Sequence, residues 1–312
     1  MKTFAFVFPG QGSQAVGMLD AWGDAPAVRR TLEEASDALG QDLGRLIREG
    51  PKEQLDLTTN TQPVMLAAGV ACYRAWLQDA GLVPEVVAGH SLGEYSALVA
   101  AGALTLGDAL PLVRFRAQAM QEAVPVGVGA MAAILGLDAD AVRSACTELV
   151  EATGETVEAV NYNDPRQTVI AGTKAGVEKA CEALKVKGAK RALPLPVSAP
   201  FHSSLMRPAA ERLKDRLAGT RFVMPQIAVV NNVDVAVRTE PAAIRDALYR
   251  QAFGPVRWVE VVQAIRARGV SRIIECGPGK VLAGMVKRIE PEAVSAAVFD
   301  PASLAEAKAL FA

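Results

Sequence analysis

One stretch of the sequence has the residue types and spacing of a serine nucleophile. Residues 89–93 (GHSLG) place Ser91 between two glycines, after the β-branched run at residues 86–88 and before apolar residues at helical spacing. A strand, G-x-S-x-G and a helix are the context of a nucleophile elbow, whose strained turn exposes the serine hydroxyl. The helix N-terminus would also favour negative charge beside the serine. We therefore predict acyl chemistry at Ser91, with an ordinary glycine-rich turn as the alternative.

A serine hydroxyl needs a base near neutral pH, and the chain contains only two histidines. His90 is adjacent to Ser91 and should point to the opposite side of the turn, which makes it a poor base. His202 lies in a proline-rich loop and is the remaining candidate. No acid stands out as a third member, because a turn already explains Asp164. A backbone carbonyl could orient the imidazole instead.

An arginine falls on the apolar face of a predicted helix. Thr105 begins this helix, with Asp108 three residues on as in a partial capping box, and we expect the helix to reach about Ala123. Arg116 projects into the apolar arc of this helix. A buried arginine is costly without an anionic partner. The sequence leaves two partners open, an internal Asp or Glu and an anionic ligand.

The first loop has the text of a dinucleotide-binding fingerprint, because residues 10–15 (GQGSQA) satisfy G-x-G-x-x-A after a predicted strand at residues 3–8. That fingerprint requires a second strand that ends in an acid about 20 residues on. Glu33 and Glu34 are near this distance, but they lie in a helical pattern. We therefore assign the loop to a different kind of site.

Hydrophobic periodicity predicts the elements that position these residues. Several helices are expected between residues 24 and 80, with breaks at Gly40, at Gly50 and at residues 58–63, and Pro63 opens the last of them. After residue 200 the pattern predicts further helices and strands, including a helix that follows the loop at residues 276–280. The helices are at 207–217, 242–253, 256–268 and 302–312, and the strands are at 227–231 and 271–275.

Residues 128–197 have the order strand, helix, strand, strand, helix, strand, which is the ferredoxin-like arrangement. Glycines and prolines at residues 125–129 and 194–200 mark its two junctions. We therefore predict an α/β fold. A large α/β-hydrolase-like domain with a mostly parallel sheet spans residues 1–127 and 198–312, and a small ferredoxin-like domain (βαββαβ) is inserted at 128–197. The small domain's strands are expected at 130–135, 157–162, 168–171 and 191–197, and its helices at 138–152 and 174–187.

Composition narrows the classes of function. The 312 residues carry a net charge of −1 and are 5% aromatic, so we expect neither a nucleic acid nor a membrane surface as partner. The four cysteines lie far apart without ligand spacing, so neither a disulfide framework nor a metal site is expected. The N-terminus lacks the pattern of a signal peptide, and no apolar stretch reaches the length of a membrane span. We expect a cytoplasmic monomer.

Several segments together resemble the malonyl-CoA:acyl carrier protein transacylases, the acyltransferase family that loads malonyl groups for fatty acid synthesis. The resemblance runs nearly end to end. It implies a mostly parallel α/β-hydrolase-like fold, a malonyl-serine intermediate and no bound cofactor. The segments are residues 9–14 (PGQGSQ), 89–95 (GHSLGEY), 114–116 (RFR), 129–132 (GAMA), 200–202 (PFH), 250–251 (RQ) and 275–279 (ECGPG).

The resemblance also implies roles for individual residues of the reaction centre. Ser91 would be the nucleophile and His202 the base, held by the backbone carbonyl of Gln251. The backbone N–H groups of Gln11 and Leu92 would form the oxyanion hole. This gives the loop at residues 10–15 a use that the dinucleotide interpretation lacked.

The resemblance implies a substrate as well. Arg116 would bind the free carboxylate of the malonyl group in a bidentate pair. Met120 and Phe201 would line the acyl pocket, and Phe201 favours malonyl over methylmalonyl. The chain departs from the usual family pattern at Pro200, where smaller residues or valine are frequent.

The implied substrates are malonyl-CoA and the phosphopantetheine thiol of acyl carrier protein, which is an acidic protein. Exposed cations are therefore candidate docking residues, although a solvated charged face is their ordinary explanation. Two other functions stay open at this point. A serine esterase or thioesterase would share the elbow and His202, and a non-catalytic carrier-binding subunit would form no covalent adduct. The candidate docking residues are Lys190, Arg191, Lys287 and Arg288.

Overall fold

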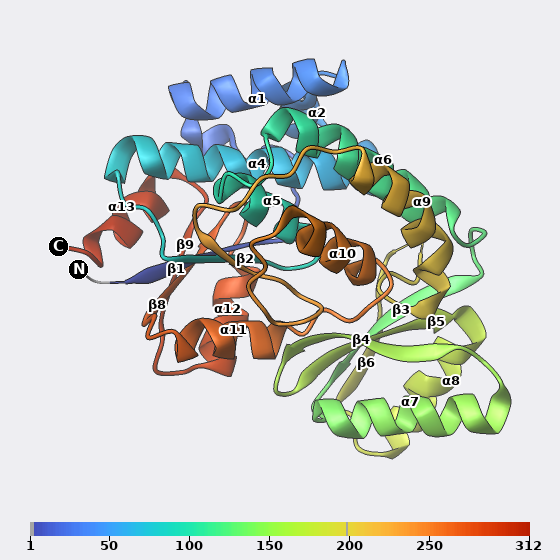
Figure 1. The fold of residues 1–312 in the computed structure, drawn as a ribbon. Coiled ribbons are helices and arrows are strands. Elements are labelled where there is room, and N and C mark those ends of the chain that lie inside the picture. The colour runs from blue at the N-terminus through green and yellow to red at the C-terminus, as the bar shows by residue number, and fades with distance from the viewer. Residues whose placement is uncertain (1–2, 198) are drawn as a thin grey trace.

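The computed structural model describes residues 3–197 and 199–312, and its strands form two sheets (Figure 1). The larger sheet has the strand order β7-β2-β1-β8-β9, and each neighbouring pair is parallel. We call this sheet and its helices the large unit. The five strands are β1 (Phe4–Phe8), β2 (Val86–Gly89), β7 (Ala228–Val230), β8 (Arg272–Cys276) and β9 (Val294–Val298).

Strand β1 is buried on both faces, as expected for the centre of a parallel sheet. Phe4, Phe6 and Phe8 point into one core, which α4 (Thr58–Ala80) and α6 (Leu106–Glu122) cover. Ala5 and Val7 point into a second core, which α11 (Trp258–Ala267) and α12 (Val281–Ile289) cover. Figure 1 shows these two helical layers on opposite sides of the sheet.

The remaining helical segments of the large unit connect its strands or pack on its outer helices. Helix α5 follows β2 directly and therefore begins at the elbow. The segments are η1 (Asp20–Trp22), α1 (Pro26–Leu39), α2 (Leu43–Glu49), α3 (Lys52–Leu55), α5 (Gly93–Ala100), η2 (Ser204–Met206), α9 (Arg207–Ala218), α10 (Pro241–Gln251) and α13 (Pro301–Ala309).

The smaller sheet is antiparallel and has the order β4-β5-β3-β6. Together with its two helices it forms the small unit. One face packs on α7 and α8, and the opposite face, which includes Met131 and Val169, turns toward the large unit. The elements are β3 (Gly129–Leu135), α7 (Ala139–Thr153), β4 (Val157–Asp164), β5 (Gln167–Thr173), α8 (Lys174–Val186) and β6 (Arg191–Pro194). The predicted fold class, a mostly parallel α/β fold with a βαββαβ insertion, is confirmed.

Three elements of the structure differ from the prediction. Helix α4 begins at Thr58 rather than after Pro63, so Pro63 lies in its second turn, where its missing N–H removes only the helical bond to the Thr59 carbonyl. Strand β6 ends at Pro194 rather than Val197, and Pro196, which has no N–H for the ladder, lies two residues beyond this end. Strand β9 is absent from the predicted elements, since its small alanines give little strand signal.

Two further predictions concern the domain boundaries and membrane-spanning segments. The predicted domain boundary at Ser198, like Met1 and Lys2, lies outside the described residues, so the boundaries stay a prediction. Among the described residues, no helix is long and apolar enough to cross a membrane.

Candidate active site

The turn between β2 and α5 has the geometry of a nucleophile elbow. Ser91 has a φ of 52°, a left-handed conformation that is strained for a residue with a side chain. A Cβ on Gly89 would lie 1.9 Å from the Gly93 carbonyl, and a Cβ on Gly93 would lie 2.1 Å from the Phe8 carbonyl oxygen. Both positions therefore require glycine because strand and helix pass so close to each other.

Ser91 and His202 meet across the cavity. The Ser91 Oγ lies 2.7 Å from His202 Nε2, and His202 Nδ1 lies 2.9 Å from the backbone carbonyl oxygen of Gln251. A carbonyl only accepts, so Nδ1 carries the ring proton. Nε2 of the neutral ring is then left with its lone pair toward the serine hydroxyl. This arrangement can remove the proton from Ser91 without an acidic third member.

Burial keeps the imidazole neutral. His202 is 3% exposed, and burial, followed by the positive charge of Arg116, lowers its pKa to about 3. An ordinary histidine would be partly protonated near neutral pH, and a protonated ring cannot act as a base. His90 faces elsewhere, since its Nε2 lies 2.8 Å from Asn163 Oδ1. His90 nevertheless lines the same cavity, so the prediction that it points to the opposite side of the turn is only partly right.

Gln11 and Leu92 also line this cavity. In the part of the chain that the structure describes, no hydrogen bond uses the backbone N–H of either residue. The Ser91 N–H, by contrast, donates to Asn232 Oδ1 at 2.7 Å and is already occupied. Two unused backbone donors beside the nucleophile are what an oxyanion hole needs.

Arg116 is 2% exposed and lies next to the nucleophile, with Nη2 3.4 Å from Ser91 Oγ. Its other hydrogen-bond partners are amides: Nη1 donates to Gln62 Oε1 at 2.8 Å, and Nη2 donates to Gln251 Oε1 at 3.1 Å. The guanidinium also lies over the Tyr95 ring, with Cζ 5.6 Å from the ring centroid. No carboxylate of the described residues forms an ion pair with it. The structure therefore rules out the internal Asp or Glu partner that the sequence left open, and burial lowers the pKa of Arg116.

The cavity between the two units has a volume of about 120 Å³. The large unit contributes the reactive groups and Met120, and the small unit contributes Met131 from β3. Phe201 packs against the α4 and α6 side of the large unit's core and against the face of the small sheet that includes Met131. Pro200 is the departure from the family pattern, and it lies close to Gly129. A Cβ on Gly129 would be 2.3 Å from the Pro200 ring. The cavity is thus small, and its lining combines apolar side chains such as Met120 with polar ones such as Gln62 and Arg116.

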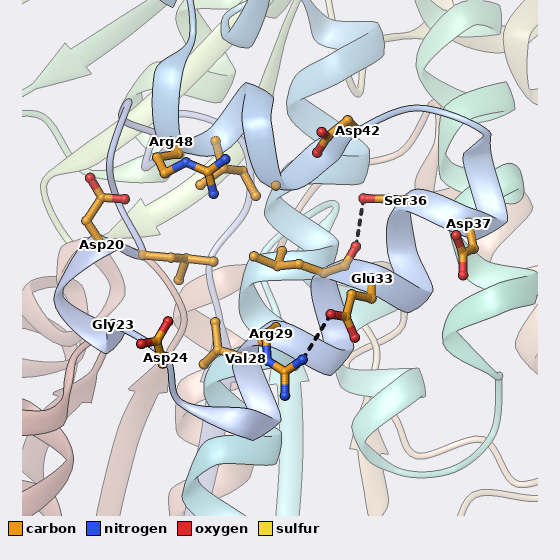
Figure 2. A pocket seen from close by; sticks show the side chains of 14 residues that line it. Asp20, Gly23, Asp24, Val28, Arg29, Glu33, Ser36, Asp37, Asp42 and Arg48 are labelled. Carbon is orange, nitrogen blue, oxygen red and sulfur yellow. Dashed lines mark hydrogen bonds and ion pairs between the residues drawn. The ribbon is translucent and has the colours of Figure 1, made fainter.

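A larger hollow of about 780 Å³ lies elsewhere, between α1 and α2 (Figure 2). Both histidines of the chain line the smaller cavity, so this hollow has no histidine base for its one serine, Ser36. Ser36 donates to the Leu32 carbonyl of its own helix, and Arg29 pairs with Glu33 (Figure 2). Chemistry rather than size therefore identifies the candidate site.

Three site residues are missing from the prediction. Gln62 lines the cavity, and in the sequence it is only a polar residue at the start of an apolar helix. Glu94 stands directly after the elbow glycine and is 2% exposed. Asn232 follows β7 at the carboxyl end of the parallel sheet, where ligands commonly bind in such folds. Its Nδ2 donates to the Gly89 carbonyl at 2.7 Å, so its amide holds both sides of the elbow.

Comparison with known proteins is consistent with this geometry. A model of the family described as the acyl transferase domain matches residues 5–299. The chain belongs to the acyl transferase family. Within this family, the malonyl CoA-acyl carrier protein transacylase of Escherichia coli strain K12 is 53% identical over 308 residues, which are 98% of this chain and 99% of the relative.

Two solved structures of acyl transferases are also similar along their whole length. The acyl-carrier-protein S-malonyltransferase of Burkholderia pseudomallei 1710b is 69% identical, with a TM-score of 0.97 over 99% of this chain and 100% of the other. A malonyl-transacylase in complex with its type II PKS acyl-carrier protein is 51% identical, with a TM-score of 0.97 over 99% and 100% of the two chains.

Proposed function

We propose that the chain transfers the malonyl group of malonyl-CoA to the phosphopantetheine thiol of acyl carrier protein, and so supplies fatty acid synthesis. The observation that carries this proposal is a buried arginine without a carboxylate partner, 3.4 Å from the serine of a Ser–His pair. Malonate has one methylene between its two carboxyl carbons. A malonyl group on Ser91 would therefore keep its free carboxylate near Arg116, whose Nη2 lies 3.4 Å from Ser91 Oγ. The names of the relatives support the same reaction.

In the first half-reaction, His202 Nε2 takes the proton of Ser91 as Oγ attacks the thioester carbon. The backbone N–H groups of Gln11 and Leu92 stabilise the oxyanion, at about 3–4 kcal/mol each by comparison with other acyl-transfer sites. The tetrahedral species then collapses, the C–S bond breaks, and His202 returns the proton to the CoA sulfur.

The second half-reaction runs the same steps with the carrier thiol. His202 takes the thiol proton, the sulfur attacks the malonyl-serine carbonyl, and the Ser91 oxygen leaves with that proton. The steps use only these protein groups and the two thioesters, so the proposal contains no bound cofactor. Arg116 pairs with the malonyl carboxylate throughout, while Met120 and Phe201 limit the size of the acyl group.

The carrier's acidic surface would meet exposed cations of the chain. Lys190, Arg191, Lys287 and Arg288 are all exposed, and Arg288 also pairs with Asp164 at 2.7 Å. They remain candidate docking residues. The protein is proposed to act as a monomer, since all the groups of the mechanism come from one chain.

A transfer assay tests the function. Protein, malonyl-CoA and holo acyl carrier protein are mixed, and malonyl carrier is measured by mass spectrometry. The expected result is malonyl carrier that requires Ser91, with little release of free malonate. Hydrolysis without transfer would instead indicate an esterase or thioesterase, and binding of the carrier without turnover would indicate a non-catalytic subunit.

A further inference from the structure

The side-chain amide of Gln251 links two buried charged groups that do not touch each other. Its Nε2 donates to Glu94 Oε2 at 3.1 Å and to the Ser91 carbonyl at 3.0 Å, and its Oε1 accepts from Arg116 Nη2. Glu94 also accepts from the backbone N–H of Asn232 at 2.9 Å. The carboxylate thus lies at one end of the amide and the guanidinium at the other.

This order fixes which way the amide points. A guanidinium can only donate, so Oε1 must face Arg116, and Nε2 is then left to donate to Glu94 Oε2, which also accepts from the Asn232 N–H. The Gln62 amide is held by the same rule, since its oxygen faces Arg116 Nη1. Arg116 therefore receives two oxygen acceptors of fixed orientation, and both are neutral.

The electrostatic consequence is a guanidinium that is oriented but not neutralised. Ion pairing with a protein carboxylate would satisfy Arg116 before any ligand arrived, and a ligand carboxylate would then have to displace it. Glu94 lowers the cost of burying the positive charge from a distance, while the two amides occupy only part of the fork. Arg116 Nε has no partner among the described residues.

We propose that Glu94, acting through the Gln251 side chain, and Gln62 are positioning residues that keep Arg116 oriented and free of a carboxylate, so that acyl groups with a terminal carboxylate are selected. This selectivity role rests on the proposed function. The role belongs to the side-chain amide of Gln251, and it is separate from the contact that the Gln251 backbone carbonyl makes with His202.

A substitution that replaces the amide nitrogen of Gln62 by oxygen tests the proposal. Gln62→Glu places a carboxylate against Arg116 with little change in shape. We expect kcat/KM for acylation of Ser91 by malonyl-CoA to fall on the order of 100-fold, the scale of a buried charge pair. Acylation by p-nitrophenyl acetate, which has no carboxylate, should fall at least about 10-fold less than acylation by malonyl-CoA, and a circular dichroism spectrum like that of the native protein shows that the variant is folded.

The chain offers a matched control for this substitution. Gln41 Oε1 accepts from Arg114 on the same helix α6, and Gln41 does not line the catalytic cavity. Gln41→Glu therefore creates the same kind of pair away from Ser91. It should leave the ratio of malonyl to acetyl acylation at the native value.

Glu94 supplies a second test that does not depend on Gln62. Glu94→Leu removes the acceptor and releases the Gln251 amide, so malonyl acylation should fall on the order of 10-fold relative to acetyl acylation. Glu94→Gln keeps an oxygen for both donors and should restore the ratio to within about 3-fold. A residue with a merely structural role would change both substrates together.

The outcomes separate this proposal from the function. No malonyl-serine on native protein would overturn both. Malonyl-serine on native protein together with a native malonyl-to-acetyl ratio in Gln62→Glu would overturn the selectivity role alone. If Gln62→Glu does not fold, equal losses for the two substrates in Glu94→Leu would overturn it.

Discussion

Two neighbouring regions of the molecule hold an arginine in opposite ways. At the end of α10, Arg250 contacts both oxygens of Asp234 at 2.6 and 2.8 Å and also pairs with Asp246. Its side chain is 33% exposed, and these bonds raise its pKa. In the cavity, Arg116 is 2% exposed, donates hydrogen bonds to neutral oxygens, and has its pKa lowered by burial.

The difference separates a structural arginine from one prepared for a ligand. Arg250 has its anions within the protein, so it holds the loop after β7 against α10 and steadies the adjacent Gln251. Arg116 bears the cost of desolvation without an internal anion, a state that is compensated only when a carboxylate enters. Residues with perturbed surroundings of this kind are concentrated at functional sites.

The largest expected effect comes from removing the cavity arginine, Arg116. Arg116→Ala should lower kcat/KM for malonyl-CoA on the order of 1,000-fold, the scale for losing a buried partner of a charge pair. Acylation by p-nitrophenyl acetate should be kept or rise. The measurement is single-turnover acylation of Ser91 with both donors. Equal losses for the charged and the neutral donor would show that Arg116 does not bind the carboxylate.

Arg250→Ala should have a smaller and different effect. We expect about a 10-fold loss for both donors alike, because Gln251 and through it His202 become less well placed. The free energy of unfolding should fall by about 1 kcal/mol, a low value because the ion pair is partly exposed. Urea unfolding and the same two acylation assays check this. A selective loss of malonyl acylation would remove the distinction between the two arginines.

The pH profile tests how the Arg116 region affects His202. Burial and the Arg116 charge lower the pKa of His202 to about 3, and the base acts only when neutral. Acylation by p-nitrophenyl acetate should therefore show no acid limb near pH 6.5, where an ordinary histidine titrates. In Arg116→Ala the limb should move to higher pH, since a repelling charge is gone. An acid limb near pH 6.5 in native protein would contradict the account.

The smallest effect concerns the carboxylates of the two regions, Glu94 and Asp234. Burial raises the pKa of Glu94 to about 7, so the folded protein binds its proton more tightly and stability should fall as pH rises from about 4.5 to 7. The hydrogen bond from Arg250 lowers the pKa of Asp234 to about 2, so its contribution exists above about pH 4 and is lost toward pH 2.

Urea unfolding as a function of pH separates these two contributions. Glu94→Gln should flatten the slope between about pH 4.5 and 7, and Asp234→Asn should reduce the slope between about pH 4 and 2. Native slopes in both variants would show that neither carboxylate is perturbed as described.

Local patterns in the sequence were enough to predict the elbow and the order of the small unit. The elbow depends on glycines that a close approach requires, and such constraints are visible at single positions. The helix that begins at Thr105 was equally predictable, because its cap is local and Thr105 accepts from the Asp108 N–H as expected. The resemblance to a family supplied the roles that spacing alone left open.

The remaining features depend on contacts that are distant in the chain. Gln62, Glu94 and Asn232 come from three separate segments, and nothing in their local spacing shows that they meet. The neutral surroundings of Arg116 could not be predicted for the same reason, since an internal ion pair was equally compatible with its helix. Strand β9 was missed because its register against β8 comes from the sheet and not from its own composition.

The central claim is that Ser91 carries the malonyl group. Intact-mass analysis after incubation with malonyl-CoA tests it directly, with native protein and Ser91→Ala in parallel. The account predicts one added malonyl group on native protein, none on Ser91→Ala, and loss of the group when holo acyl carrier protein is added. Native protein without an adduct, or an adduct that persists in Ser91→Ala, would contradict it.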